Sequence, residues 1–349
     1  MMRHQLILML FIGFIPVAGL SQESGSCAEK LKNAQTLFDR GQVEQVAGLL
    51  SDCMKSGFNR EESLAAYKLI IQTYLFEDEL QKADSAMLDF LQRNPEYQLS
   101  PTDHSSFVHL YNNFQVKPVV QISVHLGTNR PFMTFVNFRS EEDIPAVGDY
   151  STQSLNLYGS IEAKFKLSEK LELNLETGYS QLSFTNTEDF MGIGTTTYTE
   201  KQIRIEVPLS ATYNFKGLGK FTPYCRLGLG PALTLSSVAT AAFEPSDING
   251  TPRTGPAIDR EDSRISIDLF TQIGAGIKYK TRGGYMFAEV RSNFGIFNQA
   301  VREALPDETH SSQELGHFYF YEDDDINLNT ANFSIGYTLI FYKPSKRKE

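Results

Sequence analysis

The sequence predicts an α+β multidomain fold, with an N-terminal α-helical domain followed by an eight-stranded antiparallel up-and-down transmembrane β-barrel. Apolar residues recur every three or four positions up to Phe114, and from Val120 onward they alternate with polar ones. The connections between the predicted strands also alternate between short and long. The formal net charge of the 349-residue chain is -10, with acids and bases mixed along it, so we expect no nucleic-acid partner.

Residues 1–21 have the composition of a secretory signal peptide. Arg3 precedes an apolar run from Leu6 to Leu20, and small residues follow around Gly19 and Ser21. No later segment approaches the roughly 18 continuous apolar residues that a spanning helix needs. We therefore expect an exported chain without a transmembrane helix in its mature form.

Residues 23–117 are predicted to form a helical domain. Its amphipathic segments are Cys27–Arg40, Val43–Met54, Glu61–Phe76, Glu79–Arg93 and a shorter one from an N-cap at Thr102 or Asp103 to Phe114. "VEQVAGLL" and "LQKADSAML" repeat at an offset of 37 residues, and "NPEY" follows the later copy. This pattern resembles tetratricopeptide-like hairpins, which implies a protein or peptide partner. A plain helical cap or spacer is the alternative.

Two cysteines are placed to form a disulfide. Cys27 lies on the apolar stripe at the start of the first predicted helix, and Cys53 lies on the stripe at the end of the second. Antiparallel pairing of these helices brings the thiols together, and an oxidising compartment favours the bond, which contributes about 3 kcal/mol on the chain-entropy model. Lipidation of Cys27 is the alternative, but "SQESGSC" places polar residues where an apolar run would be needed.

Residues 118–343 are predicted to form the barrel, and 344–349 a basic periplasmic tail. The expected strands are Val119–Gly127, Ser154–Leu167, Lys170–Phe184, Gln202–Phe215, Phe221–Leu235, Arg264–Tyr279, Tyr285–Asn298 and Ala331–Tyr342. The short connections contain "LSEK", "KGLGK" and "TRGG", whereas 128–153, 236–263 and 299–330 are long and 185–201 is of medium length. Short turns at one end and long loops at the other are typical of a transmembrane barrel rather than a soluble sandwich.

Aromatic residues cluster near the short turns and the end of the last strand. We expect an interfacial girdle of Phe165, Tyr213, Phe215, Phe221, Tyr279, Tyr285, Phe287, Phe341 and Tyr342. The alternative is that these side chains fill one end of a soluble core. Together with the asymmetry of the connections, their shared level favours the membrane barrel, whose lipid would then be one of its partners.

If the apolar face meets lipid, charged side chains enter the lumen. The predicted lumen acids are Glu162, Glu172, Glu176, Glu206, Asp268 and Glu289, and the predicted lumen bases are Lys164, Lys166, Arg204, Arg226, Lys278 and Arg291. An eight-stranded barrel is just wide enough for its own side chains to fill it. Balanced charges in such a space predict a cross-linked polar plug rather than an open channel.

No motif predicts catalysis, a metal site or a cofactor. His125 with Ser123 or Ser160 could suggest a hydrolase, but nothing distinguishes these residues from other polar lumen residues. "EDDDINLN" has the carboxylate spacing of a calcium loop but has Leu328 where the loop needs glycine, so a solvated acidic loop is the better interpretation. We expect no enzyme activity.

The strands "VQISVHLGTN", "LNLETGYSQLSF", "YCRLGLGPALTL" and "ANFSIGYTLIFY" resemble those of PorT-like outer-membrane β-barrel proteins and, more distantly, OmpA-type barrels. The resemblance covers about Val119 to Tyr342. It implies the outer membrane of a Gram-negative bacterium and a link to protein secretion. Such proteins end the last strand in an aromatic residue, whereas here "KPSKRKE" follows Tyr342.

These features together predict a plugged, non-enzymatic barrel that serves as a membrane anchor, assembly factor or secretion-associated factor through a periplasmic helical domain. A surface receptor or adhesin that binds ligand through the long loops is the first alternative. A narrow transport pore is the second.

Overall fold

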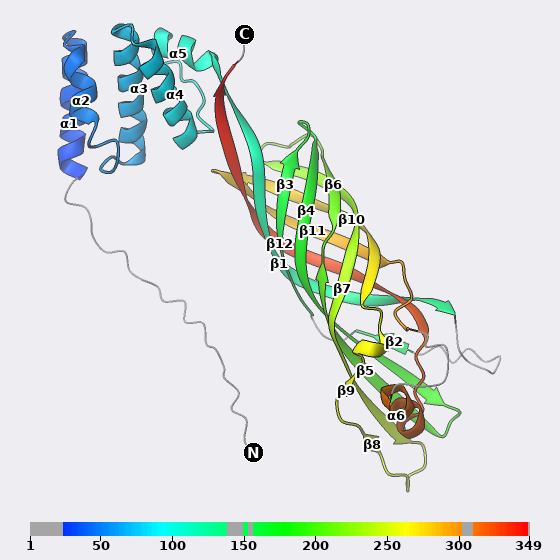
Figure 1. The fold of residues 1–349 in the computed structure, drawn as a ribbon. Helices are drawn as coiled ribbons and strands as arrows, with labels where there is room; N and C mark the ends of the chain where they lie inside the picture. Colours follow the sequence, from blue (N-terminus) through cyan, green and yellow to red (C-terminus); the bar gives the residue numbers. More distant parts are fainter. Residues whose placement is uncertain (1–23, 138–148, 153–155, 302–309, 348–349) are drawn as a thin grey trace. The chain divides into compact units, whose positions relative to one another are not determined.

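The computed structural model describes residues 24–137, 149–152, 156–301 and 310–347, so the predicted signal peptide at 1–21 lies outside the described residues. The described chain forms two compact units, drawn in Figure 1. The helical unit contains the residues up to Lys117 together with the tail from Lys343, and the barrel unit runs from Pro118 to Tyr342. Among the described helices, none is both long and apolar enough to cross a membrane.

Five α-helices and one 3₁₀-helix make up the described part of the helical unit. They are α1 (Ser24–Asp39), η1 (Val43–Gln45), α2 (Val46–Leu50), α3 (Arg60–Phe76), α4 (Leu80–Arg93) and α5 (Ser105–Asn112). The second predicted segment is therefore shorter than expected and starts as a 3₁₀ turn. The predicted N-cap of the fifth was wrong, because His104 caps α5 by accepting a hydrogen bond from the Ser106 amide.

Asp103 holds neighbouring segments together instead of capping α5. Its carboxylate accepts hydrogen bonds from Lys68 on α3 at 2.6 Å, from the Tyr97 hydroxyl at 2.6 Å and from the Ser100 amide at 2.8 Å. Burial would raise the pKa of Asp103, but the bonds from Lys68 and Tyr97 outweigh it and hold the pKa below its ordinary value. The carboxylate is therefore ionised in its role as a cross-link.

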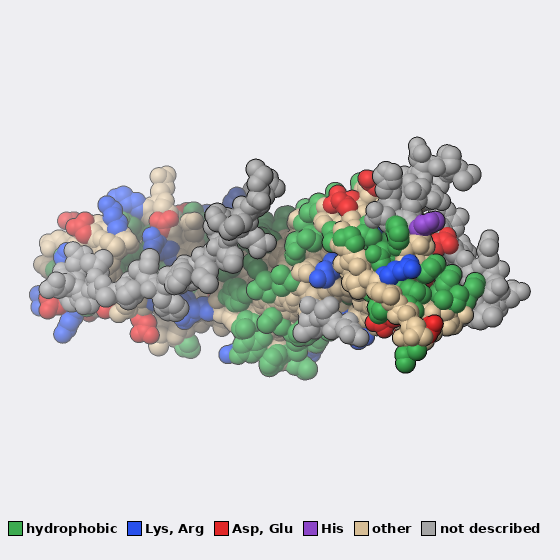
Figure 2. Space-filling model, turned by 90° about the horizontal axis from the view of Figure 1, so that it is seen from below, with side chains coloured by type: hydrophobic (Ala, Val, Ile, Leu, Met, Phe, Trp, Pro, Cys, Tyr) green, Lys and Arg blue, Asp and Glu red, His purple; other side chains and the backbone are tan. Residues whose placement is uncertain are grey.

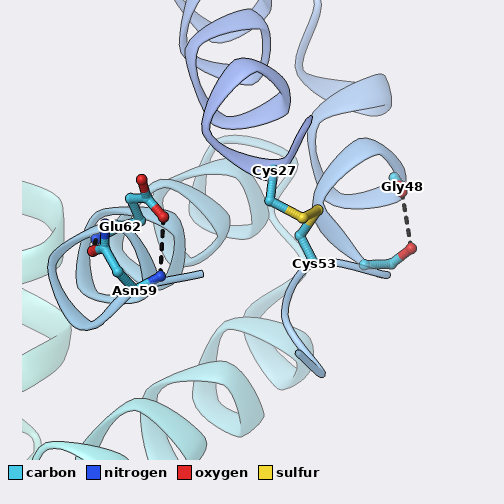
Figure 3. Close-up of a disulfide and its surroundings, with 6 residues drawn as sticks. Cys27, Gly48, Cys53, Asn59 and Glu62 are labelled. Carbon is cyan, nitrogen blue, oxygen red and sulfur yellow. Dashed lines mark hydrogen bonds between the residues drawn. A yellow bond between two sulfur atoms is a disulfide. The ribbon is translucent and has the colours of Figure 1, made fainter. Parts of the chain in front are cut away.

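The predicted disulfide between Cys27 and Cys53 is confirmed (Figure 3). The two Cα atoms lie 5.7 Å apart, and both residues are buried between α1 and the turn that follows α2. Next to it, Asn59 and Glu62 form a capping box that starts α3, with each side chain bonded to the other residue's backbone amide (Figure 3). The disulfide and the capping box fix the two ends of the segment between α2 and α3.

The barrel unit closes into an antiparallel ring, as the alternation predicted. Its strands are β1 (Phe114–Asn137), β3 (Asn156–Lys166), β4 (Leu171–Phe190), β5 (Gly194–Glu206), β6 (Leu209–Asn214), β7 (Phe221–Pro245), β10 (Ile267–Thr281), β11 (Gly284–Gly295) and β12 (Asp325–Lys346). β5 and β6 share one position between β4 and β7, β7 pairs with β10, and β12 pairs with β1, so the ring has eight positions.

The division between the two units falls at 117/118 as predicted, but several strand bounds differ, because β1, β4, β7 and β12 are longer than expected. The strand expected over 202–215 is broken between β5 and β6 at Pro208, because proline has no amide hydrogen to donate to the ladder. The first barrel strand was predicted to begin at Val119. Instead α5 ends at Asn112, β1 begins at Phe114, and Pro118 lies within β1.

The two ends of the barrel differ as predicted. We call the end that holds the short connections at 167–170, 215–220 and 282–283 the turn end, and the opposite end the loop end. The register of β1 with β3 places Gln121 opposite Lys164, near the turn between β3 and β4. The chain therefore enters the barrel at the turn end, and β12 also leaves it there.

Apolar side chains cover the outside of the ring in a continuous band. Exposed members on seven strands include Leu126, Val124, Leu157, Ile161, Leu175, Tyr179, Leu227, Leu229, Ile273, Ile277, Val290, Phe333 and Ile335. On the face shown in Figure 2, hydrophobic side chains gather into a patch over the barrel. An exposed apolar surface of this extent is what lipid contact requires.

Most of the predicted girdle also faces outward. Phe165, Tyr213, Phe215, Phe221, Tyr279 and Phe341 are exposed near the turn end, and Tyr342 is half-buried. Tyr285 and Phe287 were assigned wrongly, because both side chains are buried inside the barrel. They share the parity of Glu289 on β11, so a period of two places them on the inner face.

Beyond the band, β4 exchanges its two faces. Near the turn end its outward residues Leu171 and Leu175 are apolar, and its inward residues Glu172 and Glu176 are charged. Just past Ser180 the inward residues Leu182 and Phe184 are apolar while the outward residues become polar, as a strand that passes from lipid into water requires. The strands of the barrel thus continue into a water-exposed sheet at the loop end.

This sheet extension has its own apolar core, which includes one more helix. The buried cluster contains Leu182, Phe184, Tyr198, Ala239, Ala241, Phe243, Ile258, Leu315, Tyr319, Tyr321 and Leu328. Leu315 and Tyr319 belong to α6 (His310–Tyr319), which lies near the loop-end parts of β5 and β7 (Figure 1). The short strands β2 (Asp149–Ser151), β8 (Arg253–Thr254) and β9 (Ile258–Asp259) and the turn η2 (Glu261–Ser263) border it. Segments that we predicted as long loops are therefore partly strand and helix.

Candidate functional site: the charged interior of the barrel

Eleven of the twelve predicted lumen charges lie buried inside the barrel. They are Glu162, Lys164, Glu172, Glu176, Arg204, Glu206, Arg226, Asp268, Lys278, Glu289 and Arg291. The twelfth, Lys166, lies at the turn end instead, where its half-buried side chain pairs with Glu169 at 3.2 Å. Its position one residue before the turn places it at the rim.

The centre of the interior is built on His125, Glu162, Glu176, Arg226 and Arg291, all at most 2% exposed. Nε2 of His125 lies 2.9 Å from Glu162, and Nδ1 lies 2.6 Å from a guanidinium nitrogen of Arg291. Because Arg291 can only donate, Nδ1 accepts, and His125 is the neutral Nε2–H tautomer that donates to Glu162. Arg226 bonds Glu162 at 2.5 Å, and Arg291 bonds Glu176 at 2.7 Å.

Glu289 and two tyrosines complete this central layer. The Glu289 carboxylate lies 2.7 Å from Arg291 Nε and 3.0 Å from Arg226 Nε, and it accepts a hydrogen bond from the Tyr224 hydroxyl at 2.6 Å. The Tyr158 hydroxyl donates to Glu176. Two arginines thus bind three carboxylates that come from β3, β4 and β11, which ties opposite walls of the ring together.

A second layer lies toward the turn end. Lys278 on β10 pairs with Glu172 on β4 at 2.7 Å, and Lys164 pairs with Glu162 at 3.1 Å. The Tyr285 hydroxyl donates to Gln121, and the two ammonium groups lie over its ring at 5.4 and 4.8 Å from the centroid. The misassigned Tyr285 therefore fills the interior between two lysines.

A third layer lies toward the loop end. Arg204 is within 3.9 Å of Asp268 and donates to Gln299, while Gln299 in turn donates to Asp268 at 3.0 Å. Glu206 accepts a hydrogen bond from Asn293 at 3.0 Å. Charges in this layer are held by amide side chains as much as by opposite charges.

A fourth layer was missed from the sequence. Arg264 binds Glu200 at 2.6 Å and Asp323 at 2.7 Å, and Arg260 also pairs with Asp323. All of these residues except Arg264 lay in segments that we predicted as connections. The signal was present in β5, where Tyr198, Glu200, Gln202 and Arg204 continue one inward-facing series.

The central layer contains a set of possible metal ligands. Donor atoms of His125, Glu162 and Glu176 all lie within 4.8 Å of one another. The surrounding charges oppose a metal, because Arg226, Arg291 and Lys164 already balance the carboxylates of Glu162, Glu176 and Glu289. A divalent cation would leave two uncompensated positive charges in a buried site, so these residues do not fit one.

The candidate hydrolase pairing is not formed. Ser123 bonds Thr338 at 2.8 Å, and Ser160 donates to Glu176. Both ring nitrogens of His125 are engaged by Glu162 and Arg291, so neither activates a serine hydroxyl.

A closed antiparallel ring with an apolar outer band and a charged, ion-paired interior defines a transmembrane β-barrel of the bacterial outer membrane. The outer membrane protein beta-barrel domain family matches residues 111–300, more than half of the chain, and the chain belongs to this family. This family match does not identify the helical unit as tetratricopeptide-like or the barrel as PorT-like. No curated protein matches the chain.

Solved structures of small outer-membrane barrels are similar in fold. Neisserial surface protein A is 12% identical over 66% of this chain and 97% of its own, with a TM-score of 0.29. The outer membrane protein AlkL is 12% identical over 70% and 96%, with a TM-score of 0.33. A major outer membrane protein from Thermus thermophilus is 11% identical over 64% and 100%, with a TM-score of 0.33.

Proposed function

We propose that this protein is a sealed, non-enzymatic outer-membrane anchor that holds its helical unit in the periplasm for binding a protein or peptide partner. The observation that carries the proposal is the interior itself. Four layers of buried, paired charges cross the barrel from the turn end to the loop end. Opening a conduction path would separate these pairs in a site of low dielectric constant, at a cost of about 3 to 5 kcal/mol for each charge left alone.

The C-terminal tail from Lys343, which lies beyond the barrel unit, supports the anchoring role. Within the helical unit, the Arg347 amide donates to the Asn113 carbonyl at 2.7 Å, and Arg347 Nε donates to the Phe114 carbonyl at 3.2 Å. Gln115 bonds Ser345 at 3.4 Å. The chain on both sides of the barrel thus ends in the same helical unit, which gives that unit two covalent connections to the membrane domain.

The general rule for such barrels, in which the short turns face the periplasm, supports a periplasmic location of the helical unit. The chain enters and leaves the barrel at the turn end, so the rule assigns the helices to the periplasm. The antiparallel hairpin of α3 and α4 is the kind of element that helical-repeat domains use to bind peptides. The resemblance of the strands to PorT-like proteins suggests that this partner is a secretion component.

Sidedness can be tested by cysteine labelling in intact cells. In a Cys225→Ser background, we would place single cysteines at Phe76, which is 70% exposed in the helical unit, and at Ile248, which is 97% exposed at the loop end. An impermeant maleimide is expected to label Ile248→Cys at once and Phe76→Cys only after the outer membrane is permeabilised. Labelling of Phe76→Cys in intact cells would overturn the proposal.

A surface receptor is the second candidate, and a specific observation favours it. The loop end exposes Met191, Ile193, Phe318 and Phe320 beside its ordered core. Exposed apolar side chains on an ordered scaffold suit ligand binding. Deleting the helical unit while keeping the barrel discriminates between the two, because an anchor loses its function and a receptor keeps it.

A further inference from the structure

The turn end of the barrel carries a concentration of basic side chains that the charged interior does not use. Each of its three short connections, taken with the strand ends beside it, carries two bases, namely Lys166 and Lys170, Lys216 and Lys220, and Lys280 and Arg282. All but the half-buried Lys166 are exposed, and the acid within these connections is Glu169. We call these six residues the basic turn collar.

Backbone hydrogen bonds join the three connections into one arc. The Lys170 carbonyl accepts a bond at 2.7 Å from the amide of Asn214, two residues before Lys216. The Lys220 carbonyl accepts a bond at 2.9 Å from the Lys280 amide. The bases therefore lie along a continuous edge of the ring rather than on separate flexible loops.

Outward-facing aromatic side chains border this arc on the side of the apolar band. Phe165 and Phe215 each adjoin a collar lysine in the chain, and the rings of Phe221 and Tyr279 lie 5.0 Å apart, centroid to centroid, beside Lys220 and Lys280. Aromatic rings of membrane proteins lie at the depth of the lipid headgroups. Four of the collar bases, Lys166, Lys216, Lys220 and Lys280, are thus one residue beyond that level, which brings the collar within reach of lipid phosphates.

The loop end has the opposite charge. Exposed or half-buried acids there include Asp149, Glu188, Asp189, Glu244, Asp247, Asp259, Glu261, Asp262, Glu322 and Asp324. An anionic ligand is therefore attracted to one end of the barrel and repelled from the other. A lysine ammonium binds phosphate as a point charge and a guanidinium binds it bidentately, so the collar is suited to several phosphates at once.

From this juxtaposition of six bases, an aromatic border and the apolar band, we propose that the collar binds the headgroups of anionic phospholipids in the leaflet that meets the turn end. Multivalent binding of these headgroups fixes the depth and tilt of the barrel in the membrane. The inference does not depend on which side of the membrane the helical unit occupies.

The experiment uses the full-length protein in bilayers and exploits the absence of tryptophan from the chain. A single reporter is introduced either at the collar, as Phe215→Trp, or toward the loop end of the band, as Leu235→Trp, where both native side chains face outward. Quenching by brominated phosphatidylglycerol is compared with quenching by brominated phosphatidylcholine. The ratio gives the relative association constant of the anionic lipid at each level.

We expect a preference for phosphatidylglycerol on the order of fivefold at Phe215→Trp, which is what one base near the membrane surface supplies, and none at Leu235→Trp. The preference should disappear in K170Q/K216Q/K220Q and in 0.5 M salt. The control K201Q/R253Q, which removes two exposed bases at the loop end, should keep it. Each variant is verified as folded if its mobility on a gel still changes when the sample is heated, as the mobility of a folded barrel does.

Three results would overturn the proposal. The first is equal quenching by both lipids at the collar, which would leave an acidic protein as the partner of these bases. The second is an unchanged preference in the triple variant. The third is loss of the preference in millimolar inorganic phosphate, which would identify a free anion rather than a headgroup as the ligand.

Discussion

Nζ of Lys346 lies 2.5 Å from a carboxylate oxygen of Asp84, although 262 residues separate them in the chain. Lys346 is the last residue of β12 and belongs to the tail from Lys343 onward, beyond the barrel unit, and Asp84 lies on α4. Both belong to the helical unit, so the C-terminal tail is an integral part of a domain that the sequence builds almost entirely at the other end. We had predicted 344–349 as a separate basic tail, and the bonds of Ser345, Lys346 and Arg347 explain the difference.

Removing the tail should loosen the start of β1. Deletion of residues 343–349 removes the bonds of Arg347 to Asn113 and Phe114, each of which contributes about 1 kcal/mol. We expect faster amide hydrogen exchange around 112–117 in the full-length protein background. Lys346→Ala alone should change exchange little, because its pair with Asp84 is largely exposed and such pairs contribute about 0 to 1 kcal/mol. Unchanged exchange in the deletion would refute the role of the tail.

Arg226 should be essential to the stability of the barrel. Arg226→Met leaves the carboxylates of Glu162 and Glu289 short of a buried partner, which costs about 3 to 5 kcal/mol. We expect a large drop in the urea midpoint of unfolding, measured as the urea concentration at which half of the gel band of the folded barrel is lost. Lys166→Met at the rim is the matched control and should shift the midpoint by an amount equivalent to less than about 1 kcal/mol. Equal shifts for the two variants would contradict the layered interior.

The disulfide should stabilise the helical unit and leave the barrel unaffected. Cys27→Ser opens a covalent loop that spans a sequence separation of 26 and should cost about 3 kcal/mol. Hydrogen exchange of α1 and α2 in the full-length protein should rise accordingly, while the gel shift of the barrel persists. Protection of α1 equal to that of the wild type would show that packing alone holds these helices.

Glu188 should make the loop end sensitive to pH. It lies in the water-exposed extension of β4, where burial and the nearby carboxylate of Asp324 raise its pKa to about 7. A raised carboxyl pKa means that the folded state binds more protons than the unfolded state between about pH 4.5 and 7, so stability is lost as pH rises through that window. The effect is on the order of 1 to 3 kcal/mol.

The measurement is hydrogen exchange of the hairpin between β4 and β5 from pH 5 to 8, corrected for the intrinsic rate. Protection should fall as pH rises in the wild type and stay flat in Glu188→Gln. Glu244→Gln, an exposed acid at the same end, serves as the control and should keep the wild-type slope. The same slope in Glu188→Gln would assign the effect to another group.

The period of two made most of the barrel predictable, because it links every residue of a strand to one face. That rule placed Glu162, Arg226 and Arg291 in the interior, and its neglect on β11 produced the error at Tyr285. Pro208 indicates the break between β5 and β6, but the strand that we predicted over 202–215 ran across this proline. The sequence contains the information needed to avoid both errors.

The loop end was harder to predict for a physical reason. Once β4 leaves the lipid, its apolar residues turn from the outer face to the inner one, so Leu182 and Phe184 look like the end of a membrane strand. Which inner faces then pack together depends on α6 and on contacts between Tyr198 and Tyr321, whose rings stack 4.0 Å apart. Such contacts join residues that are distant in sequence, and no local pattern encodes them.

The sealed interior is the central claim, and the electrical conductance of the purified full-length protein in planar bilayers tests it most directly. With Arg226 and Arg291 paired across the centre, we expect no discrete conductance steps in 1 M KCl at 100 mV. Steps that appear only in Arg226→Met would show that this layer provides the seal. Stable steps in the wild-type protein that scale with KCl concentration would contradict the anchor and favour a pore.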